Sequence, residues 1–135
     1  MKNKWSKSWI SSSQPRKQRK YALNAPLHLM HRLLGAHLSK ELRGKYGMRS
    51  ATLRSGDKVK IMRGKFRGAS GTVDSVDLKT LKVYVTGAES TKKDGSKVLR
   101  PINASKLMIT DLNLNDKRRM KKFSKEKKEH KGEKQ

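Results

Sequence analysis

The residues best suited to chemistry in this chain are cations that alternate with glycines between residues 56 and 73. The cations are Arg63, Lys65 and Arg67, and the glycines of the stretch are Gly56, Gly64, Gly68 and Gly71. Glycine permits positive φ and close approach of the backbone to another surface, because it has no Cβ. Backbone N–H groups and cationic side chains together bind phosphate oxygens. The pattern therefore predicts a phosphate-binding loop; the alternative is an exposed hairpin loop that is basic only because the whole chain is basic.

Aromatic side chains are the second set that could contact a nucleic acid. Phe66 has a cation on each side within the loop, so it either stacks on an unpaired base or folds inward as core. Tyr84 lies on the outward face of its predicted strand, which favours contact with a partner. Trp5 and Trp9 have lysines around them and would anchor a membrane-surface helix, stack on bases, or stay exposed in a tail.

The sequence contains few signals of a catalytic site or of a metal-binding site. His28 and His31 share a helical spacing that suits a metal ion, but no carboxylate or thiolate completes the site. The acids Asp57, Asp74, Asp77 and Asp111 fall at predicted turns and strand ends, where hydrogen bonding to the turn explains them. No P-loop, Gly-x-Ser-x-Gly elbow or Cys–His arrangement occurs. We therefore predict no catalytic residue, no metal, no cofactor and no small-molecule substrate.

The charge balance points to a polyanionic partner. The chain has 135 residues, of which 35 are lysine or arginine and 11 are acidic, giving a formal net charge of +24. Nucleic-acid binders and membrane-surface peptides share such a balance. Hydrophobic residues make up 33%, below the roughly 45–50% of compact domains, so parts of the chain should be tails. Without cysteine or a long apolar run, an intracellular, soluble chain is expected, without homo-oligomer formation.

The elements that must position these residues begin with a basic arm over residues 1–24. Three consecutive serines and Pro15 are expected to stop any helix or strand there. Residues 25–53 should form two short helices and a linker: one helix starts at Pro26 and ends near Gly35, and Ser39 caps the second, which Gly47 follows. Residues 112–135 are expected to form a second basic tail that becomes helical when bound.

Residues 54–111 carry the strand signals, so the predicted fold class is mainly β, a small barrel preceded by the two short helices, with basic N- and C-terminal extensions. The expected strands contain Val59 and Ile61, Thr72 to Val76, Leu81 to Val85, Lys97 to Leu99, and Leu107 with Ile109. Alternation turns Lys58, Lys60 and Met62 away from the core. A parity slip predicts a bulge near Asp74 and Ser75, and Pro101 limits its strand to an edge or an end.

The stretch from Gly56 to Tyr84 resembles the KOW motif: Gly-Asp, alternating apolar residues and a basic, glycine-rich loop, with Gly71 at the motif's characteristic glycine. KOW modules occur in ribosomal proteins and in transcription elongation factors. The flanks resemble the archaeal and eukaryotic form of the universal large-subunit ribosomal protein numbered twenty-four. They are NAPLH at 24–28, AHLSKELR at 36–43, YG at 46–47, RS at 49–50, RPI at 100–102, Ser105 and LMIT at 107–110. The resemblance covers residues 16–120.

This resemblance implies an SH3-like barrel bound to large-subunit ribosomal RNA in the cytoplasm, near the exit of the polypeptide tunnel. It also implies a role early in subunit assembly, contacts with neighbouring ribosomal proteins, and a projecting hairpin at residues 91–96. The alternative is a KOW-type transcription elongation factor, although such factors usually join the module to a different domain. A chromatin-type DNA binder is a third possibility, which a preference for duplex DNA over folded RNA would support.

The predicted RNA contacts are cations spread along the chain, with one aromatic residue. They are Lys17, Arg19, Lys20, Arg32, Arg43, Lys45, Arg49, Lys60, Arg63, Lys65, Phe66, Arg67, Arg100, Lys117, Arg118, Arg119, Lys121 and Lys122. Each cation that neutralises a phosphate releases condensed counterions, so the affinity should fall steeply with salt. Specificity would then come from a match between the barrel and the shape of the RNA.

Overall fold

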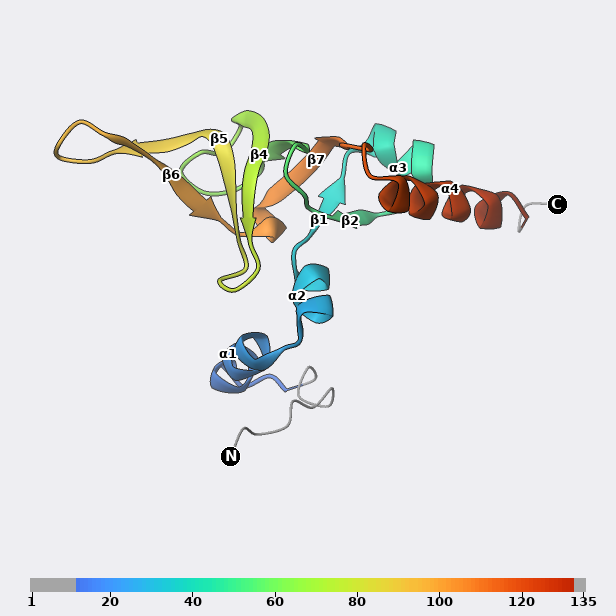
Figure 1. The fold of residues 1–135 in the computed structure, drawn as a ribbon, viewed down its shortest axis with the longest axis horizontal. Coiled ribbons are helices and arrows are strands. Elements are labelled where there is room, and N and C mark those ends of the chain that lie inside the picture. The colour runs from blue at the N-terminus through green and yellow to red at the C-terminus, as the bar shows by residue number, and fades with distance from the viewer. Residues whose placement is uncertain (1–11, 133–135) are drawn as a thin grey trace.

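The computed structural model describes the backbone of residues 12–132 and the side chains of residues 12–124. Within this range the chain is a mixed α/β fold, in which a curled, half-barrel sheet of seven strands is joined by four α-helices (Figure 1). The strands are β1 (Gly35–Leu38), β2 (Ser50–Thr52), β3 (Lys58–Ile61), β4 (Ser70–Asp77), β5 (Lys82–Thr91), β6 (Lys97–Ile102) and β7 (Leu107–Asp111). The helices are α1 (Pro15–Asn24), α2 (Leu27–Leu33), α3 (Lys40–Tyr46) and α4 (Lys117–Gly132), with a 3-10 turn, η2 (Ala104–Lys106).

The sheet has the strand order β2-β1-β7-β3-β4-β5-β6. Strand β1 pairs with β7 in parallel, and the other pairings are antiparallel. The prediction of a mainly β barrel confined to residues 54–111 is therefore too narrow, because β1 and β2 come from the segment before it. Gly35 does end the preceding helix, as expected, but the chain then enters a four-residue strand directly. So short a strand shows little alternation, and the neighbouring helical patterns conceal it.

The predicted strands of residues 54–111 are confirmed, with small shifts. Val59 and Ile61 are buried, and Lys58 and Lys60 are exposed, as the alternation indicated. The pairing of β4 with β5 shifts register between Val73 and Ser75, so the predicted bulge is present. Strand β6, which contains Pro101, is an edge strand, as the missing donor of proline requires.

Several strand boundaries differ from the prediction: β4 begins at Ser70, β5 continues to Thr91 and β6 continues to Ile102. The start of β5 differs for a local reason. Leu81 has a φ of 56° and lies in the turn before β5, so the strand begins one residue later than predicted. Asp77 organises this turn by accepting hydrogen bonds from the backbone N–H of Lys79 and Thr80 and from the Thr80 hydroxyl. The side chain of Leu81 still packs against the core.

The two short helices are confirmed in α2 and α3. The Ser39 hydroxyl accepts a hydrogen bond from the Leu42 backbone N–H at 3.3 Å, which caps α3, and Gly47 ends the helix with a φ of 70°. Residues 1–24 were expected to lack regular structure, and this expectation is wrong for Pro15–Asn24, which form α1. Pro15 occupies the first turn of the helix, where its missing N–H donor costs nothing. The predictions for Trp5 and Trp9 lie outside the described residues.

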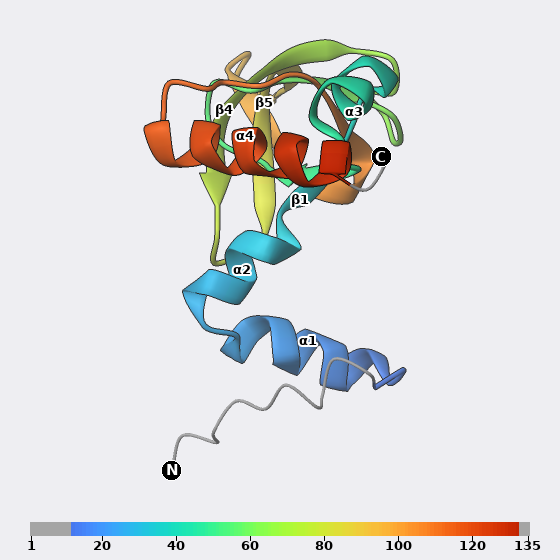
Figure 2. The ribbon, with the colours of Figure 1, turned by 90° about the vertical axis from the view of Figure 1, so that its right-hand side faces the viewer.

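The prediction of a C-terminal tail is wrong for the residues that enter α4. The Asp116 carboxylate accepts the Arg118 backbone N–H at 2.8 Å at the start of the helix. Phe123 is 4% exposed and its ring centroid lies 5.2 Å from that of Tyr46 in α3. Figure 2 shows α4 beside α3, across one end of the sheet. The first turns of α4 are therefore part of the folded unit.

None of the described helices combines the length and the apolar character needed to cross a lipid bilayer.

Candidate nucleic-acid interface

The glycine-rich loop between β3 and β4 is held in shape by its own backbone. Gly68 N–H donates to the Ile61 carbonyl at 2.8 Å, Arg67 N–H to the Gly64 carbonyl at 3.1 Å, and Ala69 N–H to the Phe66 carbonyl at 3.1 Å. These three N–H groups are thus used inside the loop. Phosphate binding here would depend more on the cationic side chains than the sequence suggested.

The glycines of the motif divide into two kinds. Gly56, Gly64 and Gly68 have positive φ angles of 87°, 93° and 90°, as predicted for Gly64 and Gly68. Gly71 does not, and its role is close packing: a Cβ there would overlap the Thr86 carbonyl oxygen and lie 2.9 Å from Val85 Cγ1. The characteristic glycine of the motif is therefore required by the contact between β4 and β5.

The cations of the loop are exposed and lie beside cations from other elements. Arg63 and Lys65 share a cavity of about 260 Å³ with Arg100 of β6 and with Lys106 of η2. Phe66 is half-buried: it packs in part against the core, as one of the two roles considered for it required, and its side chain also lines this cavity. Lys106 is not among the predicted contacts, because nothing in the local sequence distinguishes it from other lysines.

A second group of predicted residues gathers around His37 of β1. Burial lowers the pKa of His37 below its ordinary value of 6.5, and the positive charges of Arg43, Arg49 and Arg63 lower it further. The three arginines come from α3, from the segment before β2, and from the loop. The fold thus brings cations that are distant in sequence to one imidazole, which in its neutral form adds no further positive charge.

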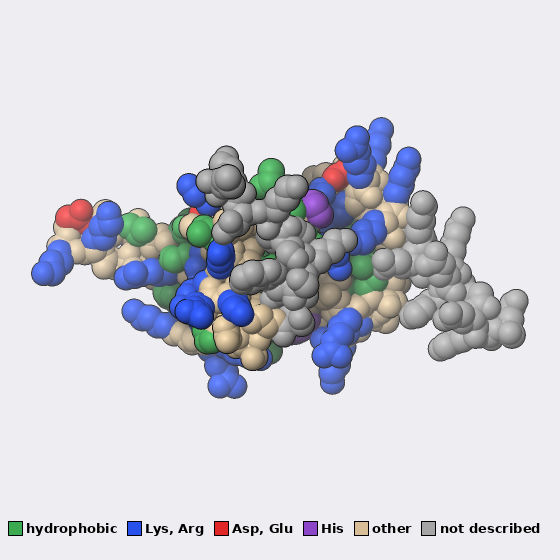
Figure 3. Space-filling model, turned by 90° about the horizontal axis from the view of Figure 1, so that it is seen from below, with side chains coloured by type: hydrophobic (Ala, Val, Ile, Leu, Met, Phe, Trp, Pro, Cys, Tyr) green, Lys and Arg blue, Asp and Glu red, His purple; other side chains and the backbone are tan. Residues whose placement is uncertain are grey.

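The N-terminal helices carry the next set of predicted contacts. Arg19 and Lys20 are exposed on α1, Arg32 is exposed on α2, and Lys17 is half-buried. Both helices lie below the sheet in Figure 1. The face seen from below shows many lysine and arginine side chains and few acidic ones (Figure 3).

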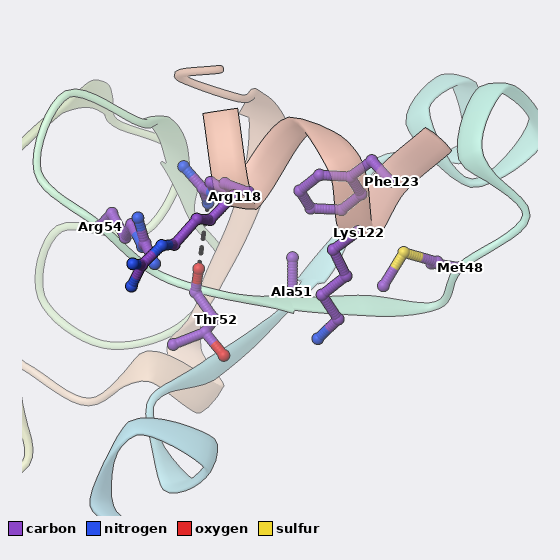
Figure 4. A pocket seen from close by; sticks show the side chains of 8 residues that line it. Met48, Ala51, Thr52, Arg54, Arg118, Lys122 and Phe123 are labelled. Atoms are coloured by element: carbon purple, nitrogen blue, oxygen red, sulfur yellow. Dashed lines mark hydrogen bonds between the residues drawn. The ribbon is translucent and has the colours of Figure 1, made fainter. Parts of the chain in front are cut away.

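The five C-terminal cations that were predicted as contacts comprise four exposed residues and one buried residue. Lys117, Arg118, Lys121 and Lys122 are exposed on α4. Arg118 and Lys122 point to a hollow of about 160 Å³ that is also lined by Met48, Ala51 and Arg54 (Figure 4).

The prediction of Arg119 as an RNA contact does not fit the structure, because the Arg119 side chain is only 6% exposed. Its Nη1 donates to Asp57 Oδ1 at 2.6 Å and its Nη2 to Asp57 Oδ2 at 2.8 Å. The guanidinium also donates to the carbonyls of Asn113 and Thr52 at 2.9 and 3.0 Å. Arg119 thus joins α4 to the sheet, and its Nη1 and Nη2 donors are used inside the fold.

Asp57 forms hydrogen bonds with backbone groups near a turn, as predicted for the acidic residues. It also forms an ion pair with Arg119, which the sequence did not indicate. It is fully buried and accepts the backbone N–H groups of Arg54 and Asn113, each at 2.9 Å. Among the residues that the structure describes, no group of three or more His, Cys, Asp or Glu side chains lies close enough to hold a metal ion.

Three further predicted residues have exposed side chains. Lys60 is on the outward face of β3 and Lys45 on α3. Arg100 is exposed on β6, and its Nε donates to the Ser90 hydroxyl at 2.6 Å across the β5–β6 pair.

The chain is similar in sequence to known ribosomal proteins. The profile of a family described as the eukaryotic L26 and archaeal L24 ribosomal proteins matches residues 12–126. The "Large ribosomal subunit protein uL24" of Methanospirillum hungatei is 51% identical over 115 residues, which are 85% of this chain and 96% of the relative. The proteins of the same name from Methanoculleus marisnigri and Methanosphaera stadtmanae are 52% and 50% identical, over 82% and 80% of this chain and 91% and 92% of those relatives.

These matches confirm the resemblance noted in the sequence, including its archaeal and eukaryotic form. They also agree with the prediction that the chain is not an enzyme. The chain therefore belongs to the family of ribosomal proteins that comprises L26 of eukaryotes and L24 of archaea.

Proposed function

We propose that this protein is a structural constituent of the large ribosomal subunit and binds large-subunit ribosomal RNA. The observation that carries the proposal is the match, over most of both chains, to proteins named as belonging to that subunit. The exposed cations of the loop and of the helices, together with exposed Arg49 and half-buried Arg43 near His37, supply the chemistry that such binding needs.

The proposed mechanism combines counterion release with a rigid cationic surface. With a net charge of +24, the chain can neutralise many phosphates, and each neutralised phosphate frees condensed ions. The fold brings Arg43, Arg49 and Arg63 near His37 before binding, and the Nε of Arg43 is held by a hydrogen bond to the Leu38 carbonyl at 2.8 Å, so ordering this side chain on association costs little entropy. Such a surface would recognise the shape of folded RNA rather than its sequence.

The finer part of the proposal concerns place and timing. The resemblance to the large-subunit family implies a position near the polypeptide exit tunnel, a role early in subunit assembly and contacts with neighbouring ribosomal proteins. The hairpin of β5 and β6 extends well away from the rest of the sheet (Figure 1), and its turn lies within residues 92–96. A projecting element of this kind can reach the tunnel mouth while the cationic loop stays on RNA.

Sedimentation of tagged protein from cell extract tests the proposal. We expect the protein to migrate with large subunits at moderate salt and to leave them at high salt together with other proteins held by charge. Sedimentation with RNA polymerase instead would favour the transcription elongation alternative. For the assembly role, depletion of the protein should cause incomplete large subunits to accumulate; a normal subunit profile after depletion would contradict that role.

A further inference from the structure

The cavity between the glycine-rich loop and β6 is lined by both cationic and apolar side chains. Four cations line it: Arg63, Lys65, Arg100 and Lys106. No acidic side chain is among its lining residues. The ion pairs found among the described side chains are formed by other residues, so these four cations are not neutralised within the part of the chain that the structure describes.

The cavity is held open by the fold. The Met62 backbone N–H donates to the Lys106 carbonyl at 2.8 Å and ties the loop to η2. Gly64 faces the same side, since a Cβ there would lie 4.0 Å from Lys106 Nζ. The hydrogen bond therefore fixes the distance between the loop and η2. The Lys106 ammonium group lies beside the Gly64 backbone, which has no side chain, so an anion can approach both groups.

The remaining walls are apolar. Ile61 and Ile102 are buried and contribute to the lining, and Phe66 is half-buried with Lys65 Nζ 6.0 Å from its ring centroid. The volume of about 260 Å³ lies just below the roughly 300–1,000 Å³ of pockets for drug-sized ligands. A duplex does not fit into such a space, whereas a single planar ring with an attached anion does.

We infer that this cavity receives one unpaired nucleotide of the bound RNA, with its base against the Phe66 ring and its phosphate between Arg63, Lys106 and Arg100. The inference rests on the proposed function, because it names the element of RNA that this site takes. Unpaired bases stack on aromatic side chains, and flanking cations hold the backbone of the same nucleotide. The site would give the protein a preference for a bulge or loop within otherwise paired RNA.

Binding of the full chain to a protein-free large-subunit ribosomal RNA transcript, measured over a series of salt concentrations, tests the inference. Phe66→Leu removes the ring but keeps an apolar side chain, and should lower the affinity about 5- to 150-fold without changing the salt slope. Phe66→Tyr keeps the ring and should bind like wild type. Lys106→Gln should reduce the salt slope by about one, and more strongly than Lys93→Gln on the distant hairpin turn.

Footprinting with dimethyl sulfate and a carbodiimide, which between them modify all four unpaired bases, provides a second readout that does not depend on the stability of Phe66→Leu. Wild type and Lys93→Gln should protect one unpaired base, and Lys106→Gln should need a higher protein concentration to protect the same base. The inference is overturned if Phe66→Leu folds and binds like wild type, or if no unpaired base is protected. Failure of the wild-type chain to bind the transcript at low salt would instead refute the proposed function itself.

Discussion

Replacing Arg119 by methionine removes the cation that joins α4 to the sheet. Arg119 forms two hydrogen bonds with the Asp57 carboxylate, at 2.6 and 2.8 Å, and two more with backbone carbonyls. Asp57 is fully buried, so after the substitution its carboxylate cannot turn to water. It keeps the backbone N–H groups of Arg54 and Asn113 but loses its opposite charge.

The expected cost follows from this geometry. Removing one member of a buried ion pair destabilises a protein by about 3–5 kcal/mol, because the other charge stays buried and uncompensated. The two backbone donors that remain on Asp57 place the value near the lower end of that range, at about 3 kcal/mol. For a chain of this length that corresponds to a fall in Tm of roughly 10 °C. Methionine fills similar space, so a cavity contributes little.

Urea denaturation followed by circular dichroism measures the loss, with Arg118→Met as the matched control. Arg118 is the preceding residue on the helix and is exposed, so its substitution should change the stability by no more than about 0.5 kcal/mol. Hydrogen exchange adds a local readout: if α4 detaches before the sheet unfolds, amides near Phe123 should exchange faster in the Arg119 variant. Equal stability of the two variants, with unchanged exchange, would refute the reasoning.

Three further predictions concern the core and one histidine. Gly71→Ala should lower the unfolding free energy by about 1–3 kcal/mol, because the new methyl group meets the backbone of β5. Gly44→Ala, which has open space around it in α3, should raise the unfolding free energy by about 0.5–1 kcal/mol. Urea denaturation of both variants measures the two changes. Phe123→Ala should cost about 3–5 kcal/mol by the same measurement, and a smaller loss would show that α4 packs loosely. His37 should titrate below pH 6.5 in an NMR titration, and Arg49→Gln should raise the pKa of His37 toward the ordinary value. Because the pKa of His37 is lower in the folded than in the unfolded chain, the contribution of His37 to stability is complete above about pH 6.5. This contribution is lost as the pH falls through the folded-state pKa.

Local sequence signals predicted the elements whose causes are local. Ser39 and Gly47 mark the two ends of α3 because a cap needs only neighbouring residues. The alternation from Lys58 to Ile61 assigns the faces of β3, and the parity slip near Asp74 locates the bulge. These are effects within a few residues of the chain.

The features that were missed depend on contacts between distant segments. Arg119 has the same charge as its exposed neighbours, and only its contact with Asp57, 62 residues earlier in the chain, distinguishes it. The strand β1 is defined by pairing with β2 and with β7, which lies about half the chain away. Pro15 predicts a break by its residue type alone, whereas in the fold it occupies the first turn of α1, a position that proline tolerates.

The same limit applies to the candidate interface. Charge alone selected the loop cations and Arg100, but it could not reveal that they share a cavity with Lys106. It also could not separate exposed arginines from Arg119, which is used inside the fold. Positions of cations in a basic chain carry little information until the fold assigns each one to the surface or to a partner.

The salt dependence of binding to protein-free large-subunit ribosomal RNA tests the central claim most directly. If exposed cations hold the RNA by releasing counterions, the logarithm of the affinity should fall linearly with the logarithm of the salt concentration. With six to ten phosphate contacts, the loss between about 50 and 200 mM salt should be roughly 10³- to 10⁵-fold. An affinity that hardly changes over this range, or no binding even at the lowest salt, would contradict the account.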